Sequence, residues 1–153
     1  MASNMSELIE SIKREFAEDL GDSISEYELS IIEDSIRILF IKVFGSANTV
    51  FEQLQSCIQT ISQLNYLRSK ISSIRYSKMI QYRPEYERMY TSLTRMGRPS
   101  KQAIDSEIFS TNQKLSQDRN IIENLDNLLM YLDNQYSLLL SYQKSLETYL
   151  YKS

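Results

Sequence analysis

A run of basic side chains between residues 68 and 101 is the part of this sequence that points most directly to chemistry. Nine lysines and arginines fall in this segment, against the two acids Glu85 and Glu87. Cations spaced along one segment bind phosphate groups, with an affinity that falls steeply as salt is added. We therefore predict phosphate contacts from eight of these bases: Arg68, Arg75, Lys78, Arg83, Arg88, Arg95, Arg98 and Lys101.

Three tyrosines are interleaved with these bases. Tyr82, Tyr86 and Tyr90 recur every four residues and so form one stripe on a helix, with Tyr76 upstream. Cations that follow a phosphate backbone, together with aromatic faces on which bases stack, are what sequence-tolerant binding of single strands requires. The same spacing is also typical of packing between two helices, so both interpretations of the stripe stay open.

A Gly-Arg-Pro sequence at Gly97 lies at the end of this basic segment. Minor-groove hooks carry an Arg-Gly-Arg-Pro core, but here Met96 separates the preceding arginine from the glycine. We favour a bend between two helices. Gly97 suits the left-handed position that ends a helix, Pro99 prevents continuation, and Ser100 can cap the next helix.

Catalytic and metal-binding groups are scarce in this composition. The chain has no histidine and one cysteine, Cys57, which rules out a Cys-His zinc site and an intrachain disulfide. The pairs Glu85/Glu87 and Asp105/Glu107 are two residues apart and point to different helix faces. We predict no enzyme, no cofactor, no metal and no small-molecule substrate, and Cys57 as a small core residue.

Glycine and proline are rare, with three and two residues in 153, which favours long helices and an all-α fold. Helical apolar spacing predicts one helix over about 48–96 and another over about 101–150, each about 75 Å long at 1.5 Å per residue. Because the two are equally long and joined by a short turn, they should form an antiparallel hairpin. Whether Pro84 kinks the first arm or ends it stays open.

Two shorter helices precede the hairpin. Ser6 is a candidate N-cap for the first, with Gly21 just past its end. Ser25 and Glu28 form a capping box for the second, which is apolar up to Gly45. Asn48 is a candidate cap for the long arm. We expect these two helices to form a bundle-like base at the open end of the hairpin.

The predicted organisation is a single helical domain, 1–153, made of acidic N-terminal helices (1–45) and a coiled-coil-like hairpin (46–153) with a basic tip around 97–100. Residues 1–34 hold ten acids against two bases. In the second arm a heptad pattern from Ile108 to Leu150 is interrupted at Thr111, Asp118 and Gln143. Residues 101–120 hold three bases and three acids, so we expect the opposing arm to leave the basic segment unneutralised.

Location and partners follow from the same pattern. The amino terminus lacks the basic and apolar regions of a secretory signal, and the apolar run at 36–44 is too short to span a membrane. We expect a cytoplasmic protein, in the host cytoplasm if the source is a virus, without membrane contact. Its expected partners are single-stranded nucleic acid and either further copies of itself or another helical protein.

The stretch SEIFSTNQKLSQDRNIIENLDNLLMYL, which begins at Ser106, follows the Tyr/Arg-rich segment and the Gly-Arg turn. With Asp118, Ile121, Asp126 and Leu128, it resembles the UvsY family of recombination mediators from T-even-like phages over roughly residues 60–140. The resemblance implies an oligomeric helical protein that binds single-stranded DNA and loads a recombinase onto it. The chain ends in SLETYLYKS, where that family has a basic, aromatic ending.

Two hypotheses about function follow. The first is a non-enzymatic accessory protein for recombination or replication, in which the eight bases contact phosphates and Tyr82, Tyr86 and Tyr90 stack on nucleic-acid bases. The second is a structural or assembly protein, a virion or scaffold component, that acts through helix-helix contacts and oligomerisation. In the second hypothesis the basic tip docks on an acidic surface such as residues 1–34 of a neighbouring copy.

Overall fold

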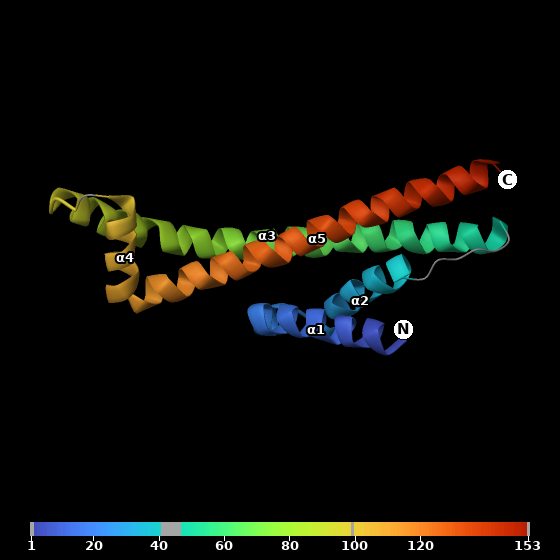
Figure 1. Ribbon diagram of the computed structural model, residues 1–153, viewed down its shortest axis with the longest axis horizontal. Helices are drawn as coiled ribbons and strands as arrows, with labels where there is room; N and C mark the ends of the chain where they lie inside the picture. Colours follow the sequence, from blue (N-terminus) through green and yellow to red (C-terminus); the bar gives the residue numbers. More distant parts are fainter. Residues whose placement is uncertain (1, 41–46, 99, 153) are drawn as a thin grey trace. The chain divides into compact units, whose positions relative to one another are not determined.

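The structure, a computed structural model, describes residues 2–40, 47–98 and 100–152 (Figure 1). These residues form five α-helices and one short 3-10 helix, with no β-strand among them, which confirms the all-α prediction. No helix in the described ranges is long and apolar enough to cross a membrane. The chain divides into two compact units, residues 1–70 with 128–153 and residues 71–127. The single domain over 1–153 stays a prediction.

The first unit begins with α1 (Ala2–Leu20), the 3-10 turn η1 (Gly21–Ser23) and α2 (Glu26–Phe40). Gly21 has φ +54°, a left-handed conformation that glycine adopts without the clash of a Cβ atom, so α1 ends where the sequence predicted. The predicted cap at Ser6 was wrong, because α1 already begins at Ala2.

The capping box at the start of α2 is confirmed. The backbone N–H of Glu28 donates to Ser25 Oγ at 3.1 Å, and the backbone N–H of Ser25 donates to Glu28 Oε1 at 2.9 Å. Two amide groups that the helix leaves without internal partners are thus satisfied by each other's side chains. The predicted end of this helix at Gly45 lies outside the described residues.

Helix α3 (Ala47–Arg95) runs through Pro84 without a break, so the proline does not end the predicted first arm. Asn48 lies inside this helix and is not its cap, since the helix begins at Ala47. The part of α3 in the first unit buries Val50, Cys57, Leu64 and Leu67 on one side. The exposed positions of the same segment lie on the opposite side of the helix.

Helix α5 (Gln113–Lys152) packs antiparallel to α3 within the first unit. The Cys57 thiol donates to the Leu139 carbonyl at 3.4 Å, and Arg68 pairs with Asp133 at 2.6 Å, so numbers fall along α5 as they rise along α3. The α5 residues that this unit buries at heptad spacing are Leu128, Leu132, Gln135, Leu139 and Leu146.

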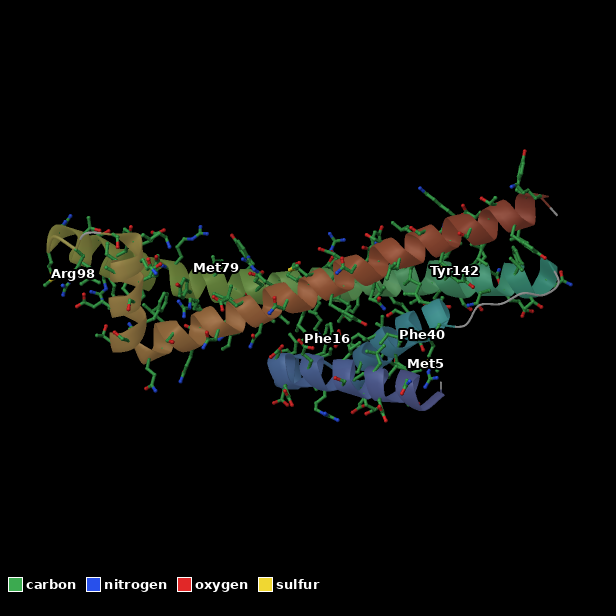
Figure 2. The ribbon with its side chains drawn as sticks, in the orientation of Figure 1. Met5, Phe16, Phe40, Met79, Arg98 and Tyr142 are labelled. Carbon is green, nitrogen blue, oxygen red and sulfur yellow. The ribbon has the colours of Figure 1, made fainter. Side chains whose placement is uncertain are left out.

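The two N-terminal helices pack on this antiparallel pair, as the predicted bundle-like base requires. The ring of Phe16, which is labelled in Figure 2, meets the Tyr131 ring edge to face, with centroids 5.9 Å apart. Lys70 of α3 reaches the buried Glu28 carboxylate of α2 at 2.7 Å. The buried amide of Gln135 donates to Ser35 Oγ of α2 at 3.2 Å.

The second unit confirms the predicted turn at Gly97, which has φ +84°. The Arg98 N–H donates to the Leu93 carbonyl and the Gly97 N–H donates to the Thr94 carbonyl, the two bonds of a Schellman motif. Ser100 then caps α4 (Lys101–Thr111) by accepting from the Ala103 N–H at 3.2 Å. The predicted role of Pro99 lies outside the described residues.

The predicted second arm, a continuous helix over 101–150, was wrong at one residue. Asn112 has an extended backbone, φ −113° and ψ 95°, and separates α4 from α5. Its side-chain oxygen accepts from the Leu115 N–H at 3.0 Å and so caps α5. Figure 1 shows α4 turning away from the direction of α5 at this point.

The core of the second unit is the buried cluster Leu93, Ile104, Ile108 and Leu115. Its members come from α3, α4 and α5 in turn. Asn112 lies between two members of this cluster, Ile108 of α4 and Leu115 of α5. Burial of these two side chains stabilises the turn between the helices.

Candidate nucleic-acid interface

The tyrosine stripe of α3 packs against α4. Tyr82 and Tyr86 stack with ring centroids 5.4 Å apart, Tyr86 and Tyr90 lie 5.9 Å apart, and Tyr86 stacks on Phe109 at 6.1 Å. All four rings pack on the buried cluster of the second unit. The structure therefore shows the packing role that the sequence left open for this stripe.

The Tyr86 hydroxyl is also engaged, because it donates to Asp105 at 2.6 Å. Burial and this hydrogen bond raise the pKa of Tyr86. Burial alone would raise the pKa of Asp105, but the hydrogen bonds from Lys101 and Tyr86 outweigh it and lower that pKa. The central ring of the stripe is thus fixed at both its face and its hydroxyl.

Most of the predicted phosphate-binding bases have carboxylate partners. On α3, Arg68 pairs with Asp133 and Arg75 pairs with Asp126, both across to α5. At the turn, Arg98, labelled in Figure 2, pairs with Glu107 at 2.7 Å.

Two further bases pair within their own helices. Lys101 pairs with Asp105 at 2.7 Å, and Arg88 binds both oxygens of Glu85, at 2.5 and 3.0 Å. The expectation that the opposing arm leaves the basic segment unneutralised was therefore wrong for Arg68, Arg75 and Arg98, whose partners lie on α5 and α4. In residues 71–127 as a whole, nine bases stand against seven acids, so the excess positive charge is two.

Three of the eight predicted bases have no carboxylate partner among the described residues: Lys78, Arg83 and Arg95. Arg83 and Arg95 are exposed, whereas Lys78 is half-buried. Their positions on α3 are five and twelve residues apart, so they do not share one face of the helix. These three predicted phosphate-binding bases are therefore separate cations on different sides of α3.

One hollow of the second unit combines such a cation with an exposed aromatic ring. It is lined by Arg75, Tyr76, Met79, Ile80, Arg83 and Pro84, all from α3. Tyr76 is 66% exposed and Ile80 is 55% exposed. Tyr76 and Arg83 are seven residues apart, two helical turns, and therefore lie on the same side of α3. Met79 of this hollow is labelled in Figure 2.

A second hollow, farther along α3, is lined by Arg88, Thr91, Ser92, Arg95 and Met96. Two guanidinium groups and two hydroxyl groups are donors that phosphate oxygens accept from. The pair between Arg88 and Glu85 is solvent-exposed, and such pairs contribute little energy, so it competes weakly with a phosphate.

Sequence reasoning missed a third hollow, between α4 and α5. It is lined by Lys101, Gln102, Asp105, Ser106, Phe109 and Arg119. The Arg119 guanidinium lies 3.8 Å from the centre of the Phe109 ring, a cation-π contact. These residues meet because the chain turns at Asn112, which the heptad pattern did not reveal.

In the described part of the chain, no group of three or more Cys, Asp or Glu side chains could hold a metal ion. Cys57 is fully buried. Burial, and to a smaller extent Glu147, raises the pKa of its thiol to about 11, so it is not a reactive thiolate at neutral pH.

No protein-family model, curated protein or solved structure matches the chain. The resemblance to the UvsY family therefore stays a prediction.

Proposed function

We propose that this protein is a non-enzymatic accessory protein that binds single-stranded nucleic acid, as a mediator of recombination or replication does. The observation that carries the proposal is the α3 hollow in which the exposed Tyr76 ring lies on the same side of the helix as Arg83. A stacking face beside an arginine without a carboxylate partner is the minimal chemistry of a single-strand site. The second hollow, with Arg88 and Arg95, supplies further phosphate contacts.

This proposal differs from the sequence hypothesis in which aromatic ring it uses. Tyr82, Tyr86 and Tyr90 pack on the buried cluster and on one another, and Tyr86 also stacks on Phe109 of α4, so these rings serve packing within the protein. Tyr76 is largely exposed, and its ring stacks on no other ring among the residues that the structure describes. Base stacking is therefore assigned to Tyr76, and the three stripe tyrosines position α3 against α4.

The test is fluorescence anisotropy of a labelled oligothymidylate titrated with the protein at several salt concentrations. Tyr76→Ala should weaken binding by about 5- to 150-fold, because stacking is worth about 1–3 kcal/mol per base. Tyr151→Ala is the matched control, since Tyr151 is 94% exposed in the other unit and should leave binding unchanged. Equal affinities for the two variants would refute the assignment of Tyr76.

The phosphate contacts have their own readout. For single strands the logarithm of affinity falls with the logarithm of salt concentration by about 0.7 per phosphate neutralised. Arg83→Gln with Arg95→Gln should therefore lower that slope by about 1.4. Arg14→Gln, an exposed arginine of α1, is the control. Absence of oligonucleotide binding by the wild type at low salt would sink the proposed function as a whole.

The second candidate is a structural or assembly protein. It is favoured by the basic second unit and the exposed acids of α1, which include Glu7, Glu10 and Glu15. If the basic surface docks on such acids of another copy, Arg88→Glu with Arg95→Glu should reduce the oligomer mass without nucleic acid present. Unchanged mass by light scattering would count against this candidate.

A further inference from the structure

The segment of α3 that belongs to the first unit presents one exposed face without any charge. The positions are Phe51, Gln55, Ile58, Ser62, Tyr66 and Ser69, all of them exposed, and we call them the α3 face. Their spacing of three or four residues places them on one side of the helix. The buried side chains of this segment, which include Cys57, Leu64 and Leu67, lie on the opposite side.

The α3 face is apolar for a surface. Phe51 is 51% exposed, Ile58 is 46% exposed and Tyr66 is 57% exposed. Between Glu52 and Arg68 no position of α3 carries a charge. A solvated helix face normally carries charged side chains, and contiguous exposed apolar side chains mark interaction sites. This face lies outside the unit that holds the proposed nucleic-acid site.

Five of the six residues of the α3 face, all except Phe51, pair with one another in reverse order. In an antiparallel pair centred on Ser62, residues whose numbers add up to 124 face each other. Ile58 then meets Tyr66, Gln55 meets Ser69, and Ser62 meets Ser62 of the other copy. Small serines at the centre allow the helix axes to approach to about 8 Å, with larger side chains packing on either side.

The charges that flank the α3 face agree with this arrangement. Glu52 and Lys70 are eighteen residues apart, five full helical turns, and so lie on the same flank of α3. An antiparallel pair brings Glu52 of each copy beside Lys70 of the other. Lys70 already binds Glu28 within its own copy. The contact between Glu52 and Lys70 of two copies therefore favours the antiparallel orientation of the dimer and adds little to its affinity.

We infer that the α3 face binds the α3 face of a second copy of this chain, antiparallel, with Ser62 on the two-fold axis. An isologous contact of this kind closes on itself and yields a dimer. The inference does not depend on the proposed nucleic-acid site.

Sedimentation velocity over a range of protein concentrations, without nucleic acid, tests the dimer. Ile58→Glu should weaken it by at least about tenfold, because each dimer would then bury two carboxylates without partners. Leu138→Glu is the matched control, since Leu138 is 53% exposed on α5 and lies off the α3 face. A wild-type protein that stays monomeric, or equal effects of the two variants, would overturn the inference.

Cysteine crosslinking tests the register. Ser62→Cys should form a covalent dimer on mild oxidation, because helices about 8 Å apart bring facing Cα atoms within disulfide distance. Gln55→Cys should not crosslink to itself, but should crosslink to Ser69→Cys when the two proteins are mixed. The native Cys57 is buried and gives a low background. Self-crosslinking of Gln55→Cys with none at Ser62→Cys would contradict the antiparallel register.

Discussion

Replacing Asn112 by alanine tests whether one side chain keeps α4 and α5 apart. Asn112 acts on both helices. Its N–H donates to the Ile108 carbonyl at 2.8 Å at the end of α4, and its Oδ1 accepts from the Leu115 N–H at 3.0 Å at the start of α5. Alanine retains the first bond and removes the second, together with the weaker bond from Asn112 Nδ2 to Met89 Sδ at 3.3 Å. It also favours the continuous helix that the heptad pattern predicts.

The expected cost is that of a lost N-cap, about 1 kcal/mol within a range of about 0.5–2. For a chain of this size, that should lower the melting temperature by about 2–4 °C. The assays are urea unfolding and thermal melting followed by circular dichroism. Helix content of the native protein should not fall, because Asn112 is itself outside both helices.

Asn112→Asp is the matched control. It keeps the side-chain acceptor and adds a negative charge at the amino end of α5, which the helix dipole favours. Its stability should stay close to that of the wild type and above that of Asn112→Ala, because the dipole interaction offsets the lost weak bond from Nδ2 to Met89 Sδ. If Asn112→Ala were as stable as the wild type, or Asn112→Asp as unstable as Asn112→Ala, the capping argument would be refuted.

Three further predictions concern side chains whose partners are fixed in the structure. Burial acts to raise the pKa of Glu28, but hydrogen bonds from Lys70 and Ser25 outweigh it and lower that pKa below 4.5. Its stabilising contribution is therefore complete above pH 4.5 and is lost as pH falls through the folded-state pKa, so in urea titrations the stability difference between wild type and Glu28→Gln should shrink in acid. Tyr86→Phe should lower stability by about 1 kcal/mol through the lost bond to Asp105, and oligonucleotide affinity measured by anisotropy should stay unchanged, because the ring serves packing. A disulfide reagent at pH 8 should modify Cys57 at least about tenfold faster in urea than in the native protein, and rapid native labelling would contradict a buried, protonated thiol.

The sequence predicted helix ends correctly where a capping hydrogen bond or a glycine turn between neighbouring residues determines the end. Gly97 and Ser100 end one helix and start the next as their residue types indicate, and the box of Ser25 with Glu28 forms as its spacing indicates. Each of these devices depends on a few neighbouring residues and on no distant contact. The predicted caps at Ser6 and Asn48 failed, because α1 begins earlier, at Ala2, and α3 begins one residue before Asn48, at Ala47.

The break at Asn112 had a sequence signal, but a competing one hid it. The heptad pattern is interrupted at Thr111, and Asn112 is a good capping residue. Ile108 and Leu115, seven residues apart, nevertheless satisfy the heptad on either side. Both are buried in one cluster in the folded chain as well, so the apolar pattern alone does not distinguish a turn from a continuous helix.

The ion pairs of the basic residues could not be predicted from the sequence, for a geometric reason. The predicted hairpin places Arg68 opposite Leu129 and Arg75 opposite Ile122, which offer no charge. The observed partners, Asp133 and Asp126, lie one helical turn farther along α5. Arginine side chains are long enough to reach a carboxylate one turn away. A comparison of directly facing residues therefore underestimates how many arginines of α3 are paired with acids of α5.

The buried amide of Gln135 determines which leucines can meet which helix. Leu128, Leu132 and Leu139 are nearly equivalent, so apolar packing alone would tolerate a slip of α5 by one turn. Gln135 donates to Ser35, whose hydroxyl in turn donates to the Ile32 carbonyl, and a slipped helix would bury this amide among leucines. One polar side chain thus disfavours any alignment of α2 and α5 in which Gln135 does not reach Ser35. A leucine at position 135 would bury more apolar surface but would not distinguish between these alignments.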